Sequence, residues 1–244
     1  MGATLAARDL GRSYGDREVL RGVSFTVPAG GSLSVVGRSG SGKTTLLNLL
    51  AGLVGPGRSA GEVATDPPGA GRAYLMQGCA LFPWKTVAAN LELPLALAGA
   101  SRRERGARVA EALRELGLEG LGHRYPHEIS GGERQRAALG RALAAGAEVV
   151  LLDEPFSALD AIARERLQDA VDSLFARKGL TSVVATHGID EAVRLGDRVL
   201  VLGGRPSGIT AEIPNPRRRE SGFRSSEAAF RLALEIRRAL EDGT

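Results

Sequence analysis

The sequence has one cysteine, Cys79, and no uninterrupted apolar run of about 18 residues, the length that a membrane-spanning helix needs. A single cysteine excludes an intramolecular disulfide, which fits a reducing compartment. The first residues, Met1 to Leu10, contain no basic segment followed by an apolar core, so we expect no signal peptide. A role at a membrane would therefore require docking on another subunit.

A large excess of either charge is also missing, because 32 basic residues face 28 acidic ones and the formal net charge is +4. The charges are interspersed, and the first long basic run is Arg217 to Arg219. This balance favours an anionic ligand and disfavours nucleic acid as the main partner. The 244 residues, 43% of them hydrophobic, suffice for a sizeable core in one large domain or in one domain with a subdomain.

A phosphate-binding loop is the clearest motif in the chain. Leu33 to Val36 predicts a buried strand, and Gly37 to Thr44 matches G-x-x-x-x-G-K-[ST], whose backbone N–H groups surround an anion at the start of a helix. The alternative is a plain Gly/Ser-rich turn. Lys43 would reach the β- and γ-phosphates, and the Thr44 hydroxyl would ligate Mg²⁺. The expected nucleotide-binding residues are Gly37, Arg38, Ser39, Gly40, Ser41, Gly42, Lys43, Thr44 and Thr45.

The segments on either side of this loop predict a mixed fold. Thr4 to Val27 is strand-like with turns at Gly11 and Gly15, which indicates a small antiparallel layer before the nucleotide core. A helix is expected over Thr44 to Leu53. The Gly/Pro-rich stretch that follows predicts a connector around a short strand near Glu62.

Polar side chains end two further predicted strands. Arg72 to Gln77 ends on an amide, and Glu148 to Glu154 is an apolar strand followed by two adjacent carboxylates, Asp153 and Glu154. Open α/β sheets place their ligand groups at the carboxyl ends of strands. In phosphoryl transfer the first acid holds the Mg²⁺ shell and the second polarises the attacking water. Burying two neighbouring acids for structural reasons alone would be costly.

Two single residues each allow two interpretations. Thr181 to Thr186 predicts another buried strand and delivers His187 at its end, either as a donor to a phosphate oxygen or as a structural residue. Tyr14 is either a packing aromatic or a stacking face for a purine. Ser157 to Asp160 leads into a long helix.

A helical insertion is predicted from Thr86 to about Ala144. Ser101 to Glu104 is a capping box, and apolar residues then recur at helical spacing. The insertion contains Ser130-Gly-Gly132 at the start of a helix, which creates a second anion site from free N–H groups and the helix dipole. Alternatively, this turn is only a well-capped helix start.

An apolar loop and the C-terminal region complete the pattern. Leu81 to Lys85 holds the only tryptophan, Trp84, which indicates a docking surface or, alternatively, the cap of a local core. Pro214 to Arg224 is Pro/Arg-rich and predicts a mobile link. An amphipathic helix is expected from about Ser226, with its apolar face folded back on its own subunit.

The ordered motifs resemble the nucleotide-binding subunit of an ATP-binding cassette (ABC) transporter over residues 3–205. This resemblance implies an α/β fold, in which a P-loop NTPase core carries an N-terminal antiparallel β-subdomain and an inserted α-helical subdomain at about 86–144. The expected domains are 1–205 for the cassette and 206–244 for a linker with the amphipathic helix. The motifs that carry the resemblance are Tyr14, Gly37 to Thr45, Gln77, Ile129 to Glu133, Val149 to Glu154, Ser157 to Asp160 and His187.

The resemblance implies a division of work around ATP and Mg²⁺. Glu154 would be the catalytic base, His187 would clamp the γ-phosphate, and Gln77 would sense Mg²⁺ and the attacking water. Asp153 would support the metal together with Thr44 and Gln77.

The family further implies that ATP is sandwiched between two copies arranged head to tail. Tyr14 would stack on adenine in one copy, while Ser130, Gly131 and Gly132 would close on the γ-phosphate held by the other. Asp160 would help to join the two sites across this homodimer.

Three positions depart from the commoner family pattern. Gly78 and Gly188 stand where many relatives carry an acidic residue, which would alter the stiffness of both loops. Ile129 replaces a leucine of the same volume. None of these changes removes a group that hydrolysis needs.

The stretch from Gln77 to Leu93 is similar to importers of the nitrate, sulfonate and taurine type. The resemblance therefore implies an ATP-hydrolysing import subunit on the cytoplasmic face of the plasma (inner) membrane. It would dock on a permease near Gln77 to Lys85, act indirectly with a substrate-binding protein and bind no nucleic acid. The alternative is a non-transport ABC ATPase acting on nucleic acid or ribosomes. A nucleotide kinase would leave Ser130-Gly-Gly132 and His187 without a role.

Overall fold

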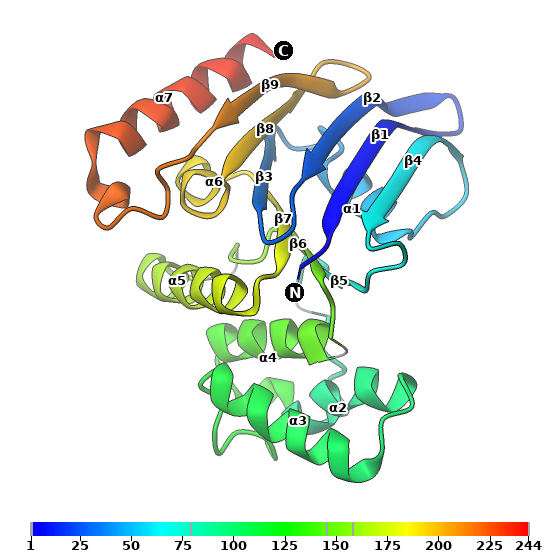
Figure 1. Cartoon of the computed structure of the whole chain (residues 1–244), viewed down its shortest axis with the longest axis vertical. Coiled ribbons are helices and arrows are strands. Elements are labelled where there is room, and N and C mark those ends of the chain that lie inside the picture. The colour runs from blue at the N-terminus through cyan, green and yellow to red at the C-terminus, as the bar shows by residue number, and fades with distance from the viewer. Residues whose placement is uncertain (1, 79, 145, 158, 244) are drawn as a thin grey trace.

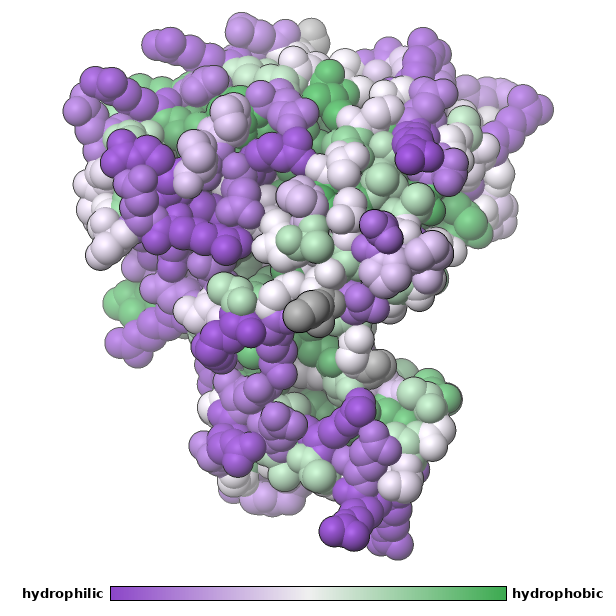
Figure 2. All heavy atoms as spheres, in the orientation of Figure 1, coloured by the Kyte–Doolittle hydropathy of each residue, from purple (hydrophilic) through white to green (hydrophobic). Residues whose placement is uncertain are grey.

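The computed structural model describes residues 2–78, 80–144, 146–157 and 159–243. Figure 1 shows three parts: a sheet flanked by helices, an antiparallel sheet beside it, and a group of helices below both. Figure 2 shows that the apolar surface on this face is broken into small patches among hydrophilic side chains. Among the helices of the described ranges, none is long and apolar enough to cross a membrane.

The central sheet has six strands in the order β5-β6-β7-β3-β8-β9. All neighbours pair in parallel except β8 and β9, which are antiparallel. The inner strands are apolar because helices cover both faces of the sheet. The strands are β3 (Ser32–Gly37), β5 (Arg72–Leu75), β6 (Val149–Asp153), β7 (Thr181–Thr186), β8 (Arg198–Gly203) and β9 (Gly208–Pro214), with helices α1 (Lys43–Ala51), α5 (Ala161–Lys178) and α6 (Ile189–Leu195).

The N-terminal antiparallel layer is confirmed, with β1 (Thr4–Tyr14) between β2 (Arg17–Val27) and β4 (Arg58–Asp66). Gly15 makes the predicted turn at φ 57°. The turn predicted at Gly11 is wrong, because Gly11 lies within β1, where the register shifts between Leu10 and Arg12. The strand near Glu62 is longer than expected because it pairs along most of β1.

The inserted helical subdomain consists of α2 (Val87–Leu97), α3 (Arg102–Glu115), the 3₁₀ turn η1 (Pro126–Glu128) and α4 (Gly131–Ala144). Thr86 and Ser101 cap α2 and α3 by accepting the N–H groups of Ala89 and Glu104 at 3.2 and 3.3 Å. The buried apolar faces of α2, α3 and α4 form one core with β6 and α5. The insertion is therefore packed onto the sheet and is not a separate body.

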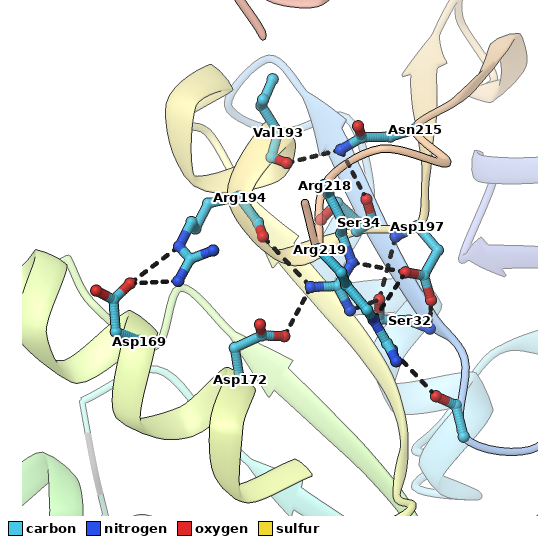
Figure 3. A network of polar contacts seen from close by, with 12 residues as sticks. Ser32, Ser34, Asp169, Asp172, Val193, Arg194, Asp197, Asn215, Arg218 and Arg219 are labelled. Carbon is cyan, nitrogen blue, oxygen red and sulfur yellow. Dashed lines mark hydrogen bonds and ion pairs between the residues drawn. The ribbon is translucent and has the colours of Figure 1, made fainter. Parts of the chain in front are cut away.

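The C-terminal region differs from its prediction. Residues 206–244 do not begin as a linker, because β9 continues the central sheet next to β8. The following segment is anchored where a mobile link was expected, since Asn215 and Arg218 are each 2% exposed. Sequence reasoning predicted a mobile link for this Pro/Arg-rich stretch, but Arg218 donates hydrogen bonds to carboxylates on distant elements (Figure 3). Helix α7 (Glu227–Asp242) packs back on α6 and β8 as expected.

Candidate functional site

The carboxyl edge of the central sheet brings the predicted site residues together. Strand β7 lies between β6 and β3, and all three run parallel. The phosphate loop after Gly37, the acids Asp153 and Glu154, and His187 therefore leave the sheet at one edge. The sequence predicted this meeting because each group follows a buried strand.

The phosphate loop has the backbone that its glycines allow. Gly40 and Gly42 lie at φ 78° and 84°, in the left-handed region. A Cβ at Gly37 would stand 2.3 Å from the Ser41 hydroxyl, and a Cβ at Gly42 would stand 2.8 Å from a methyl carbon of Leu20. Only glycine fits these two positions, so the loop curls tightly and packs against β2.

Lys43 closes the mouth of this loop. Its ammonium donates hydrogen bonds to the carbonyl oxygens of Gly37 and Arg38 at 2.8 and 3.2 Å. Burial lowers the pKa of Lys43, against the opposite pull of the charges on Glu154 and Asp153. The Lys43 ammonium is thus held beside the two acids, in a position to bind a phosphate.

Asp153 is buried with an incomplete set of partners. It is 1% exposed, and the Tyr74 hydroxyl donates to its Oδ2 at 3.4 Å. Burial raises the pKa of Tyr74, and so does the neighbouring charge of Asp153. Within the part of the chain that the structure describes, Asp153 Oδ1 and the Ser41 hydroxyl are buried without a hydrogen-bond partner. Such atoms cost stability unless a ligand completes them.

These oxygens fit Mg²⁺ carried by a nucleotide. In the described ranges no group of three or more His, Cys, Asp or Glu side chains could hold a metal ion on its own. Mg²⁺ typically uses one or two protein oxygens together with phosphates. Asp153 and the exposed Thr44 hydroxyl at the start of α1 supply that kind of donor set.

Glu154 and His187 form a second pair at the ends of β6 and β7. Oε2 of Glu154 lies 2.5 Å from Nδ1 of His187, and their side chains are 13% and 70% exposed. Glu154 has φ 48°, which is strained for a residue with a side chain, and its N–H donates to the Ala185 carbonyl at 2.9 Å. This backbone turn directs the carboxylate toward the exposed imidazole.

Gln77 lies outside the strand that was predicted to end with it. Strand β5 ends at Leu75, and Gln77 lies in the turn beyond it, exposed. Gly78 follows at φ 86°, where a side chain would be strained, so the glycine at this departure from the family pattern suits its turn. Cys79 lies outside the described residues.

The serine-diglycine turn belongs to another part of the molecule. Ser130 and Glu133 form a reciprocal cap: the Ser130 hydroxyl accepts the Glu133 N–H at 3.3 Å, and the Glu133 carboxylate accepts the Ser130 N–H at 2.7 Å. The hydrogen bonds from the Ser130 backbone and hydroxyl lower the pKa of Glu133. Helix α4 packs on α2, α3, β5 and α5, whereas the phosphate loop packs on β2.

Tyr14 and Asp160 lie at the ends of secondary structure elements. Tyr14 ends β1 with 43% of its surface exposed. Asp160 caps α5, because its Oδ1 accepts the Ala163 N–H at 2.9 Å. Ala158, in the motif before Asp160, lies outside the described residues.

Sequence reasoning missed Glu191 on α6. Burial raises the pKa of this carboxyl to about 7, and the charge of Glu154 raises it further, while a hydrogen bond with Thr186 lowers it. Its Oε1 is buried, with no hydrogen-bond partner among the described residues. The available signal was an acid on the inner face of the helix that follows His187. The site therefore holds a third carboxyl behind Glu154.

The apolar loop after β5 exposes Trp84 and is hydrogen-bonded to α2. Trp84 is 71% exposed and its ring lies 5.5 Å from that of Phe82, so it does not cap a local core. Asn90, 0% exposed on α2, accepts the Phe82 N–H at 2.8 Å and donates to the Lys85 carbonyl at 3.1 Å. Asn90, which sequence reasoning also missed, holds the backbone of this loop on α2, while Phe82 packs against the guanidinium of Arg141 and Trp84 stays exposed.

Comparisons with known proteins identify the relatives of this chain. The family model described as ABC transporter matches residues 20–157. The chain is 44% identical to the aliphatic sulfonates import ATP-binding protein SsuB 2 of Nocardia farcinica, over 86% of this chain and 85% of the relative. It is 43% identical to the taurine import ATP-binding protein TauB of Rhizobium johnstonii, over 78% of this chain and 73% of the relative.

A solved structure of similar fold is the dimeric post-hydrolysis state of the ATP-binding cassette MJ0796 bound to ADP and Pi. The two chains superpose with a TM-score of 0.75 at 30% sequence identity, over 86% of this chain and 98% of the other. The similarity therefore extends across nearly the whole of that cassette.

Proposed function

This chain belongs to the ABC transporter family as an ATP-hydrolysing import subunit, and on that premise we propose that it powers uptake of a sulfonated organic compound. The proposal for cargo rests on relatives named for aliphatic sulfonates and for taurine. The single observation that carries the catalytic part is the meeting of Lys43, Asp153 and the Glu154–His187 pair at one sheet edge.

The nucleotide phosphates would lie in the loop from Gly37 to Thr45. Lys43 would exchange its two carbonyl partners for phosphate oxygens, a favourable exchange because those oxygens are charged. Thr44, Gln77 and Asp153 would hold Mg²⁺. When bound, Mg²⁺ would offset negative charge on the phosphates during transfer. The unpartnered Oδ1 of Asp153 and the buried Ser41 hydroxyl support this assignment.

Glu154 would take the proton from the attacking water. In the present conformation its Oε2 lies 2.5 Å from Nδ1 of His187, so a turn of His187 would free that oxygen to accept the proton. The 70% exposed imidazole has room to turn and donate to the γ-phosphate. Release of Glu154 and clamping of the γ-phosphate would thus be one movement of His187.

A second copy would complete each nucleotide pocket. The turn at Ser130, Gly131 and Gly132 packs in the helical insertion, whereas its own phosphate loop packs on β2. The exposed Ser130 and the N-terminus of the 14-residue helix α4 offer donors to a phosphate held by the partner copy. Asp160 would lie at the same contact. The dimeric state named for the MJ0796 structure supports this arrangement.

Trp84 and Phe82 would dock on a membrane permease at the cytoplasmic face of the inner membrane. The loop is 71% exposed at Trp84 and follows Gln77 by only a few residues. Docking here would link permease movement to the residue assigned to sense Mg²⁺ and the attacking water. A substrate-binding protein would act through the permease, and the proposal includes no nucleic acid.

The dimer is tested with the Glu154→Gln variant, which should bind ATP without hydrolysing it. With ATP and Mg²⁺ the purified variant should elute and scatter light as a dimer, and with ADP as a monomer. A variant that stays monomeric with ATP, both alone and in its membrane assembly, would contradict the proposed closure.

The permease partner is tested by pull-down from a detergent extract with wild-type protein and with Trp84→Ala. Wild type should recover an integral membrane protein, and the variant should recover several-fold less while keeping its ATP affinity. Cells lacking the subunit should lose growth on taurine or alkanesulfonates as sulfur source. Recovery of RNA or DNA alone, with no membrane protein, would favour the non-transport alternative.

A further inference from the structure

Arg12 lies buried against the face of Tyr14. Arg12 belongs to β1 and is 3% exposed, yet its guanidinium carbon stands 4.7 Å from the centroid of the Tyr14 ring. That distance is within the range of a cation–π contact. A buried arginine at this place would be costly unless all its donors were used.

The guanidinium is held by the connector between α1 and β4 and by the start of β4, to which Ser59 belongs. It donates to the Ser59 hydroxyl at 2.5 Å and to the carbonyl oxygens of Gly55 and Pro56 at 2.6 and 2.9 Å. The connector wraps closely, because a Cβ at Gly57 would stand 3.0 Å from a guanidinium nitrogen. Three hydrogen bonds therefore fix the position of the guanidinium beside the ring.

The ring lies at a distance from the phosphate loop that a nucleoside can span. Arg12 pairs with Leu20 across the hairpin, and Leu20 packs against the loop at Gly42. Tyr14 is two residues further along β1, which is about 7 Å at the usual rise of a strand. The covered face of the ring is the inner one, since Arg12 is buried while Tyr14 is 43% exposed. Its outer face is left for a base.

We propose that Arg12 is a positioning residue that presents the Tyr14 ring to the purine of ATP, giving a stack of base, ring and guanidinium. This inference rests on the proposed role of Tyr14 in binding adenine. A ring already ordered by Arg12 loses less side-chain freedom when the base binds. Arg12 therefore contributes to affinity for the base without touching the nucleotide.

The test compares ligands with and without a base. Dissociation constants for ATP and for inorganic tripolyphosphate, each with Mg²⁺, are measured by calorimetry in the Glu154→Gln background, which binds ATP without hydrolysing it, with and without Arg12→Lys. Lysine keeps the charge but cannot hold several acceptors and a ring face together. We expect ATP binding to weaken about three- to ten-fold and tripolyphosphate binding to stay within two-fold. Equal weakening for both ligands would mean damage to the phosphate loop and would overturn the inference.

Two further single variants check the route of the effect. Arg17→Lys makes the same change at an exposed arginine opposite Tyr14 in the hairpin, and should leave both dissociation constants unchanged. Ser59→Ala removes one hydrogen bond from Arg12 and should weaken ATP binding by about three- to five-fold, with tripolyphosphate binding again within two-fold of its starting value. Ser59→Ala also keeps the inference testable if Arg12→Lys folds poorly, because an unchanged ATP constant there would overturn it.

Tyr14→Leu separates this inference from the function on which it rests. In that background Arg12→Lys should no longer change the ATP constant, because there is no ring to position. If Tyr14→Leu weakens ATP binding but Arg12→Lys does not, Arg12 is only a structural residue. If Tyr14→Leu leaves ATP binding unchanged, the assignment of Tyr14 to adenine fails instead.

Discussion

The two ends of strand β3 carry polar clusters of opposite kind. At its amino end, Ser32 accepts a hydrogen bond from Arg218 at 2.8 Å inside a closed network of ion pairs (Figure 3). At its carboxyl end, Gly37 opens the phosphate loop beside Asp153, whose Oδ1 is buried without a partner in the described chain. The same strand thus joins a completed cluster to an incomplete one.

The completed cluster stabilises the fold. Arg218 donates to Asp197 and Asp172 at 2.6 and 2.7 Å, and its side chain is 1% exposed. Burial raises the pKa of Asp197, but the charge and hydrogen bonds of Arg218 and a Ser32 N–H outweigh it and the net shift is downward. The arginine thereby fastens the C-terminal segment to β3, α5 and the turn before β8.

The incomplete cluster contains groups that lower the stability of the fold. Glu154 is held at φ 48°, and burial keeps the pKa of Glu191 at about 7. Strain and unpaired polar atoms persist where the surrounding fold enforces them and where a ligand can relieve them. The two clusters therefore differ in whether their polar groups have partners, and not in polarity: the groups at the structural end are paired, and those at the phosphate-loop end, which we propose is the catalytic end, are not.

The largest expected effect is at the catalytic end. Glu154→Gln should lower ATP turnover by about 10²- to 10⁴-fold, because the amide cannot take a proton from water. Steady-state phosphate release measures this, and the folded chain should keep its melting temperature within a few degrees. Glu62→Gln, at an acid with a 65% exposed side chain on β4, is the matched control with unchanged turnover. Turnover above a tenth of wild type would exclude Glu154 as the base.

At the structural end, Arg218→Met should lower the free energy of unfolding by about 3 kcal/mol, since two carboxylates would lose their buried partner. The neighbouring Arg217 is 60% exposed and paired with Glu220. Arg217→Met should therefore lower the free energy of unfolding by less than about 1 kcal/mol. Urea unfolding measures both, and ATP turnover per folded molecule should be close to wild type. Equal losses in the two variants would contradict the distinction between the clusters.

ATP with Mg²⁺ should supply partners only to the polar groups at the proposed catalytic end of the sheet. In the Glu154→Gln background, ATP with Mg²⁺ at about one hundred times the dissociation constant should stabilise the fold by about 2.7 kcal/mol. Removing Mg²⁺ with EDTA should abolish most of this gain, as should Lys43→Ala. Adding Arg218→Met should leave the gain unchanged, because the two clusters share no partner. Thermal melts with and without ligand measure each case.

The smallest expected effect is a pH dependence at Glu191. Its folded-state pKa of about 7 lies above the usual 4.5, so its contribution to stability is full below about pH 4.5 and is lost as pH rises toward 7. Glu191→Gln should therefore be more stable than wild type by about 1–3 kcal/mol at pH 8, with no gain at pH 4.5. Asp190→Asn, at an exposed neighbour, should show neither change. The groups that act on the Glu191 carboxyl are Thr186, Glu154 and Arg164. If Glu191→Gln raised the stability equally at both pH values, titration of Glu191 would be excluded as the cause.

Sequence predicted the catalytic end well because its signals are local. Apolar runs before Gly37, Asp153 and His187 identified β3, β6 and β7, and parallel strands bring such ends together. The structural end left no comparable signal. Arg218 lies 186, 46 and 21 residues from Ser32, Asp172 and Asp197, so its burial could not be predicted from its own Pro/Arg-rich surroundings.

The sequence by itself determined the order and spacing of the motifs, the strands that carry them and hence the family. Only the tertiary structure decided which polar groups are complete: Arg218 with all its partners, Asp153 and Glu191 with atoms left over, and Arg12 under the Tyr14 ring. The physical reason is the separation in sequence over which each kind of interaction acts. Strand periodicity and loop backbone depend on neighbours in sequence, whereas desolvation and pairing of a charge depend on whichever distant elements the fold packs around it.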